Sequence, residues 1–297
     1  MAVVLASTLA ACGSGSGSGQ APADGSGTGG YPGGADIIAW GDSWTSGVGA
    51  VDGMSYPDQL ATITGRPVFN AGVSGQTSDQ IAARQGSIPA LLTLPNDTLP
   101  GSGPVMIEFQ STYPVSAEGP GPITGTLAGI HGTLSFAGGL VFESATPGAA
   151  TSVPPRSPFI PDTFGSQAEI NVFWNGGNNF YDPSGVQADI AASVAFLSTG
   201  KFIVLAILNP GSEGSGTQTY AEIVQLNADL AATYPANFID IRAVLVAAYD
   251  PASAEDVRDH ARDVPPASFR NDDEHLNEAG YGVVAETVAA LIRVKGW

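Results

Sequence analysis

The sequence predicts an α/β fold, a three-layer α/β/α sandwich around a central, mostly parallel sheet of five strands. Short apolar segments are followed by segments whose apolar residues recur at helical spacing, which is the order typical of a parallel sheet with helices on its faces. The most apolar segment, residues 202–207, contains no polar residue, as expected of a central strand that is buried on both faces. This order is interrupted once, between residues 100 and 167, where short β-like runs alternate with glycines and prolines.

The predicted elements of the α/β part follow from this periodicity and from local start and stop signals. The first helix, for example, has Pro57 near its first turn and Gly65 at its C-terminal cap. The predicted strands are residues 37–40, 67–70, 168–174, 202–207 and 238–241. The predicted helices are residues 56–65, 79–85, 183–197, 219–234, 242–249 and 277–294.

Residues 100–167 are interpreted as an inserted small β-subdomain. Within them, residues 129–136 alternate between apolar and polar or small side chains, which is typical of a half-buried antiparallel strand. Two roles are open for this region. Its sheet could lie beside the active-site face and contribute to substrate binding, or it could be a structural addition without that role.

The N-terminal part is expected to lie outside the folded domain, which should comprise residues 36–297. Residues 2–11 are apolar but too few to span a membrane, and they end at Leu9-Ala10-Ala11-Cys12, which is similar to a bacterial lipobox. Residues 1–12 are therefore predicted to be a signal segment in which Cys12 is lipidated, although no Lys or Arg precedes the apolar run. The alternative is an alanine-rich N-terminus without this role. Residues 13–35, rich in glycine and serine, predict a flexible tether.

Composition narrows the class of partner. The chain of 297 residues has 10 basic and 28 acidic side chains, a formal net charge of −18. Nucleic acids and anionic membrane surfaces both favour Lys and Arg, so neither is expected as the main partner. The charge fits a secreted protein, or a lipoprotein of the bacterial cell surface or outer membrane, that acts on neutral or cationic material. The one cysteine excludes an intrachain disulfide.

The candidate site starts at Gly41-Asp42-Ser43, a turn that directly follows the first predicted strand. The carboxyl ends of parallel strands are where open α/β sheets place their ligands. A serine there needs a base, and Asp272-Asp273-Glu274-His275 provides one just before the last predicted helix. Three residues apart across a turn, Asp272 can orient the imidazole Nδ1 of His275 and leave its Nε2 facing Ser43.

These motifs, taken in order, resemble the SGNH hydrolase (GDSL esterase/lipase) superfamily. Gly41-Asp42-Ser43 is similar to its nucleophile block and residues 70–75 to its glycine block. Residues 176–179 are similar to its Gly-x-Asn-Asp block, with Asn179 where the family usually has Asp, and residues 272–275 to its acid/base block. The resemblance covers roughly residues 36–98 and 168–297, and it implies a flavodoxin-like arrangement of the sheet.

The resemblance also implies roles for individual residues. Ser43 would be the nucleophile, His275 the general base and then the general acid, and Asp272 the residue that orients His275. The oxyanion would be held by the backbone N–H groups of Ser43 and Gly75 and by the side-chain amide of Asn178. Asn179 should change a structural hydrogen-bond pattern and leave the chemistry intact.

Several neighbouring residues compete for roles. Asp273 is an alternative to Asp272 as the acid. His131, on the alternating strand, is expected to be a structural or substrate contact, and His260 to lie on a solvated helix face. Trp44, next to the nucleophile, is expected to line the acyl pocket and bind substrate. Three aromatic side chains are expected in the core: Trp40, Phe173 and Trp174. For Arg84 and Gln85, a surface position and a position in the site both stay open.

The sequence therefore predicts a serine esterase without a metal or other cofactor, since no cluster has metal-ligand spacing and no glycine-rich loop leads into Lys-Ser or Lys-Thr. By analogy with SGNH enzymes that carry insertions, small acyl groups on carbohydrate are the expected substrates, acetyl above all. Lipase, aryl-esterase and thioesterase activities are alternatives. A hypothesis from another class is a surface glycan-binding protein on the same scaffold that has lost turnover. Oligomeric state is not predicted.

Overall fold

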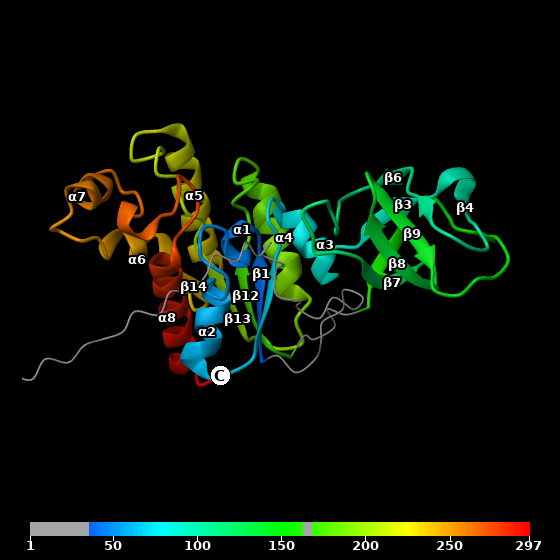
Figure 1. Cartoon of the computed structure of the whole chain (residues 1–297), viewed down its shortest axis with the longest axis horizontal. Coiled ribbons are helices and arrows are strands. Elements are labelled where there is room, and N and C mark those ends of the chain that lie inside the picture. Colours follow the sequence, from blue (N-terminus) through cyan, green and yellow to red (C-terminus); the bar gives the residue numbers. More distant parts are fainter. Residues whose placement is uncertain (1–35, 163–167) are drawn as a thin grey trace, which may run out of the picture.

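The structure is a computed structural model that describes residues 36–162 and 168–297. The predicted signal segment with Cys12, the predicted tether and residues 163–167 lie outside the described residues. Figure 1 shows two regions along the long axis of the molecule, an α/β region and a β-rich region. In the sequence, the residues of the β-rich region lie between two strands of the α/β region.

The α/β region is built on a five-stranded sheet in the order β14-β13-β12-β1-β2, in which every neighbouring pair is parallel. This confirms the predicted α/β fold with a parallel five-stranded sheet. The chain moves outward from β1 in both directions, to β2 on one side and to β12, β13 and β14 on the other. The strand order therefore reverses at β1, and a ligand is expected at the carboxyl end of this strand. The strands are β1 (Ile37–Gly41), β2 (Val68–Gly72), β12 (Ile170–Trp174), β13 (Phe202–Leu205) and β14 (Phe238–Ile239).

Helices connect these strands and cover them. Helix α2 packs against α8, and α3 packs against α4. The long helices start at side-chain caps: Asn277 accepts hydrogen bonds from the backbone N–H groups of residues 279 and 280 at the start of α8. The helices are α1 (Ser43–Ser46), α2 (Tyr56–Thr64), α3 (Ser78–Gln85), α4 (Pro183–Ala195), α5 (Gln218–Thr233), α6 (Ile241–Ala247), α7 (Ala254–Ala261) and α8 (Glu278–Lys295), with a 3-10 turn at Ala267–Phe269.

Two predicted strands end earlier than their apolar sequence indicates. Strand β13 stops at Leu205, and the side-chain amide of Asn227 then pairs with both the N–H and the C=O of Ile207 at 2.8 Å. A side chain of α5 thus replaces a neighbouring strand. Strand β14 stops at Ile239 because the side chain of Asp240 caps α6 by accepting a hydrogen bond from Ala243 N.

The β-rich region contains a seven-stranded antiparallel sheet in the order β5-β9-β8-β7-β11-β3-β6. It starts at Ala90, upstream of residue 100, where the predicted insertion begins. Its buried apolar side chains, among them Phe142 and Phe159, form a cluster separate from the core of the parallel sheet. Its strands are β3 (Ala90–Thr93), β5 (Val105–Met106), β6 (Phe109–Gln110), β7 (Ile123–Leu127), β8 (Ile130–Phe136), β9 (Leu140–Ser144) and β11 (Ser157–Pro161); after a 3-10 turn at Pro95–Asp97, β4 (Thr98–Leu99) pairs with β10 (Thr151–Ser152).

Within the two described ranges, no helix combines the length and the apolar character that a membrane crossing requires.

Candidate active site

Ser43 lies at the first residue of α1, directly after β1, where the strand order reverses. The turn is tight because residue 41 is glycine: a Cβ there would lie 2.1 Å from Thr45 Oγ1 and 2.7 Å from the carbonyl oxygen of Trp174. Asp42 caps the short helix by accepting a hydrogen bond from Trp44 N at 3.1 Å. The turn leaves the Ser43 side chain partly exposed at the carboxyl edge of the sheet.

His275 connects Ser43 to Asp272. Its Nε2 lies 3.1 Å from Ser43 Oγ, and its Nδ1 lies 3.0 and 3.1 Å from the two carboxylate oxygens of Asp272. Burial opposes ionisation of Asp272, but the backbone N–H groups of His275 and Glu274 and the imidazole together lower the pKa of its carboxyl to about 2. Asp272 is therefore ionised at neutral pH. It holds the proton of a neutral imidazole on Nδ1, so that Nε2 can accept the Ser43 proton.

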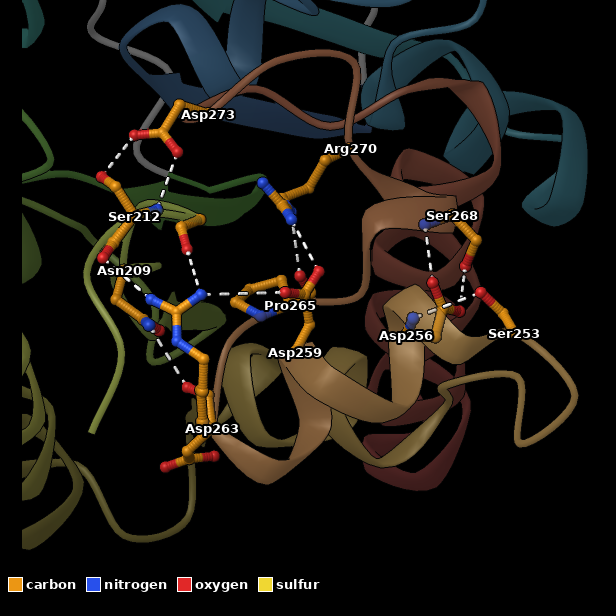
Figure 2. Close-up of polar contacts among 12 residues, drawn as sticks. Asn209, Ser212, Ser253, Asp256, Asp259, Asp263, Pro265, Ser268, Arg270 and Asp273 are labelled. Atoms are coloured by element: carbon orange, nitrogen blue, oxygen red, sulfur yellow. Dashed lines mark hydrogen bonds and ion pairs between the residues drawn. The ribbon is translucent and has the colours of Figure 1, made fainter.

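Asp273, the alternative acid, has its hydrogen-bond partners elsewhere. Its carboxylate accepts hydrogen bonds from the N–H and the hydroxyl of Ser212, both at 2.7 Å (Figure 2). Its own carbonyl accepts a third bond from Gly211 N. Asp273 thus fastens the loop that follows β13 to the loop that carries His275.

The loop of His275 is also fixed by contacts of Arg270 and Gly49. Arg270 donates to Asp259 at 2.7 Å and to the carbonyl of Pro265 at 3.0 Å, as Figure 2 shows. Gly49 packs so closely against this loop that a Cβ there would lie 3.0 Å from the Cβ of His275. Gly49 also has φ +95°, a conformation that favours glycine. Arg270 therefore holds the loop, and Gly49 packs against the base itself.

The two other predicted oxyanion donors lie on the loops after β2 and β12. Asn178 is exposed and lines the same cavity as Ser43; its Nδ2 donates to the carbonyl of Gln76 at 3.0 Å. Gly75 is exposed in a turn at φ +76°, with open space where a side chain would be. That turn is tied to α1, since the hydroxyls of Ser74 and Ser46 are 3.2 Å apart.

Asp42 is a site residue that the sequence reasoning missed. Its side chain is buried beneath Ser43 and accepts hydrogen bonds from Trp44 N, from the backbone of Gly177 and, at 3.4 Å, from Asn178 Nδ2. Burial raises the pKa of this carboxyl to about 7, although the backbone donors lower it. The Gly-Asp-Ser tripeptide already contained this aspartate, but the sequence interpretation assigned a role only to its serine.

The cavity at Ser43 has a volume of about 80 Å³. Trp44 lies in its wall and is fixed there: its Nε1 donates to the carbonyl of Glu274 at 2.8 Å, and the centre of its ring lies 5.4 Å from that of Trp174. The cavity is lined by Asp42, Ser43, Trp44, Gly177, Asn178, Phe180, Leu208, Pro210, Ile223 and Glu274.

Arg84 lies neither on the surface nor in the site, the two positions that the sequence left open. It is buried, its ring contact is Trp40, and its guanidinium donates to the carbonyl of Ala71 at 2.7 Å and to Gln76 Oε1 at 3.0 Å. Burial lowers the pKa of this guanidinium to about 9. Arg84 therefore holds both ends of the segment that contains Gly75. Gln85 is buried as well.

Asn179 joins helices α3 and α4. Its Oδ1 accepts a hydrogen bond from Ser78 N at 3.1 Å, and its Nδ2 donates to Ser78 Oγ at 3.0 Å. The Ser78 hydroxyl in turn donates to Asp189 at 2.5 Å. These contacts hold α3, which follows the Gly75 turn, against α4.

The other two histidines have partners outside this site. His131 on β8 pairs with Asp162 at 2.5 Å and is exposed on the antiparallel sheet. His260 on α7 is exposed, as expected, but its ring stacks on Tyr249 at 4.0 Å and its Nδ1 lies 3.1 Å from the carbonyl of Val246. Among the residues that the structure describes, no group of three or more His, Cys, Asp or Glu side chains could hold a metal ion.

No protein-family model matches the chain. Among curated proteins it is similar to the tail spike protein of Salmonella phage epsilon15, with 27% identity over 276 residues. That alignment covers 80% of this chain but 25% of the tail spike, so the chain spans about a quarter of the length of this relative.

Among solved structures, the chain is similar to the lipase/acylhydrolase from Enterococcus faecalis, with 13% identity, a TM-score of 0.48, and coverage of 87% of this chain and 95% of that one. It is also similar to AlinE4, an SGNH-hydrolase family esterase, with 17% identity, a TM-score of 0.35, and coverage of 68% of this chain and 74% of that one. At such identities and TM-scores, the case for a function rests on the geometry of the site.

Proposed function

We propose that this protein is a serine esterase of the SGNH type that hydrolyses carboxylic esters through an acyl-enzyme. The observation that carries the proposal is the unbroken series of hydrogen bonds from Ser43 Oγ through His275 to an ionised Asp272. This is the arrangement that activates a serine hydroxyl as a nucleophile. It lies at the edge of the sheet where α/β folds bind ligands, beside a cavity.

The proposed reaction has two steps. In the first, Ser43 Oγ attacks the ester carbonyl while His275 Nε2 takes its proton; the ester C–O bond breaks, and the leaving alcohol takes that proton from His275. In the second, His275 takes a proton from water, the hydroxide oxygen attacks the acyl carbon, and Ser43 recovers the proton as the carboxylic acid leaves. Asp272 stays ionised throughout and stabilises the imidazolium that forms in each step.

The developing oxyanion is assigned to the Ser43 N–H, the Gly75 N–H and the Asn178 amide. Removal of one such donor typically costs about 3–4 kcal/mol of transition-state stabilisation. Two observations support this assignment for Asn178: it lines the cavity with Ser43, and a 3.0 Å hydrogen bond to the carbonyl of Gln76 holds its amide nitrogen in place. The second N–H, whose contact with Asp42 is long at 3.4 Å, would turn to the oxyanion. Because the bond to Gln76 already fixes the amide, this change of partner requires little reorganisation in the transition state.

The acyl group is proposed to be short, with acetyl favoured. The cavity at Ser43 measures about 80 Å³, and Trp44, which bounds it, is fixed by a hydrogen bond and a ring contact. One water molecule needs about 10–15 Å³ of cavity space on this measure, so the cavity suits a small group of several heavy atoms. The preferred substrates are thus short-chain esters such as acetates, and carbohydrate acetates are proposed by analogy with SGNH enzymes that carry insertions.

The test is hydrolysis of p-nitrophenyl acetate by the wild type and by the Ser43→Ala and His275→Ala variants. Each substitution should lower kcat by about 10⁴-fold or more, because the groups act as a unit. His260→Ala is the matched control, since that histidine contacts Tyr249 and Val246 instead of Ser43. Unchanged rates in both site variants would exclude the serine mechanism, and glycan binding without turnover by the wild type would favour the glycan-binding alternative.

A further inference from the structure

A second, larger cavity lies next to the Ser43 cavity. It has a volume of about 400 Å³ and is formed by the segment that leads into α4 and by one face of α5. Phe180 lines both cavities, so they adjoin at this ring. The residues of the larger cavity are Phe180, Tyr181, Pro183, Gln218, Ala221, Glu222, Gln225, Leu226 and Asp229.

One part of this cavity is aromatic and apolar. The side chain of Tyr181 is 69% exposed, and its ring stands edge-on to that of Phe180, with centroids 5.9 Å apart. Pro183, Ala221 and Leu226 add apolar surface. A large aromatic side chain that lines a cavity and is exposed to this degree offers a flat contact surface to a ligand at a low cost in side-chain entropy.

The other part of this cavity is polar and is formed by α5. Four residues at helical spacing on α5 form two amide–carboxylate pairs: Gln218 Nε2 donates to Glu222 at 2.7 Å, and Gln225 Nε2 donates to Asp229 at 2.9 Å. Each bond occupies one oxygen of its carboxylate, and each carboxylate retains a second oxygen that can accept hydrogen bonds from ligand hydroxyls. The nine lining residues include two carboxylates and no cation, which disfavours phosphate, sulfate and carboxylate ligands.

We propose that this second cavity binds the alcohol part of the ester, and that this alcohol is a neutral sugar. The C–H face of the sugar ring would contact Tyr181, its hydroxyls would donate to Glu222 and Asp229, and its acetyl group would pass Phe180 to reach Ser43. An acyl chain fits worse, because methylene groups would remove water from the two carboxylates without offering a hydrogen bond in return. This inference rests on the proposed esterase function, and it assigns the leaving alcohol to a place and a chemical class.

The experiment compares kcat/KM for three esters that differ in the part that reaches this cavity. Ethyl acetate has an alcohol too small to fill it, an acetylated xylo-oligosaccharide has a sugar alcohol, and ethyl hexanoate has a longer acyl chain. Tyr181→Ala should lower kcat/KM for the sugar acetate by about 10-fold, mainly through KM, and leave ethyl acetate within about twofold. Tyr181→Phe should keep most of the activity on the sugar acetate, because the ring remains.

Glu222→Gln should also weaken turnover of the sugar acetate selectively. Glu286→Gln, an exposed change of the same kind on α8, is its control, since residue 286 lines neither cavity. Equal losses on ethyl acetate and the sugar acetate, losses confined to ethyl hexanoate, or a wild type that prefers ethyl acetate to the sugar acetate would each overturn the inference.

Binding to the Ser43→Ala variant separates this inference from the proposed reaction. Calorimetric titration of that variant with the acetylated xylo-oligosaccharide should show binding that Tyr181→Ala weakens by about 10-fold in Kd. Such binding together with no esterase activity in the wild type would remove the proposed function and keep the sugar site. If turnover of ethyl acetate depends on Ser43 but no binding depends on Tyr181, the proposed function is kept and the sugar site is excluded.

Discussion

The two regions of this molecule have different interiors. The parallel-sheet region buries ionisable side chains, among them Asp42, Arg84 and Asp189, and surrounds them with hydrogen-bond partners. In the antiparallel region, from Ala90 to Pro161, the buried polar side chains are Thr112 and Ser157 and the rest of the described core is apolar. Buried charge is expensive and is found where it positions other groups, so this difference indicates which region performs chemistry.

The regions meet close to the proposed oxyanion turn. Thr112 Oγ1 donates to Asp79 Oδ2 at 2.6 Å, and Gln76 Nε2 donates to the carbonyl of Pro114 at 3.4 Å. Asp79 lies in the first turn of α3, and Gln76 directly follows Gly75. The antiparallel region is thus joined to the site region through the segment after β2, while the residues that line the Ser43 cavity all come from the α/β region.

The largest expected effect is at the two neighbouring aspartates of the His275 loop. Asp272→Asn should lower kcat by about 10⁴-fold, because an amide favours the wrong imidazole tautomer. Asp273→Asn should lower kcat far less, since it weakens only the contacts to Ser212. Steady-state kinetics with p-nitrophenyl acetate measures both. Equal losses would show that Asp273 has a part in the reaction beyond fastening the loop.

A core substitution in the antiparallel region should affect stability without affecting chemistry. Phe142 is fully buried and packs edge-on against Phe159, with ring centroids 6.2 Å apart. Phe142→Ala should lower the free energy of unfolding of this region by about 3–5 kcal/mol. At a temperature where the variant is folded, kcat for ethyl acetate should equal that of the wild type.

Denaturant titration followed by circular dichroism gives the loss of stability, and Phe142→Leu is the milder control. A fall in kcat of the folded Phe142→Ala protein would show instead that the antiparallel region shapes the site.

Another effect concerns the dependence of stability on pH. The pKa of Asp42 is raised in the folded state to about 7, so the folded protein holds a proton that the unfolded chain releases near the usual value of 3.8. Its contribution to stability is present below about pH 4 and is lost as the pH rises to about 7. The slope is at most about 1.4 kcal/mol per pH unit for one group.

Urea titrations of the wild type and of Asp42→Asn between pH 4 and pH 8 measure this contribution. The wild type should lose stability relative to the variant as the pH rises. Asp272, whose pKa is lowered to about 2, has the opposite sign: its contribution is lost as the pH falls from about 4 to about 2. A difference between wild type and Asp42→Asn that stays constant with pH would contradict the raised pKa of Asp42.

Sequence patterns predicted the parallel sheet because each strand is a short apolar run with its own stop signal. They also placed Ser43, Asn178 and His275 correctly at strand ends or before a helix, since these positions follow from strand boundaries. What they did not predict depends on contacts between distant parts of the chain. Arg84 reaches back to Ala71. Beyond the end of β13 at Leu205, a side chain of α5 takes the place of a neighbouring strand. The antiparallel sheet includes residues from Ala90 onward.

The close packing of glycines around α1 has a consequence for how this protein tolerates change. A Cβ on Gly72 would lie 2.1 Å from Ser46 N, and one on Gly177 would lie 2.9 Å from Asp42 Oδ2. Gly41, Gly72 and Gly177 thus surround the helix that starts at Ser43 and leave no room for side chains at these positions. In a screen of random substitutions scored by activity alone, such glycines would therefore be as intolerant as the nucleophile, although they carry no reactive group. Only a parallel measurement of folding would tell the two kinds of position apart.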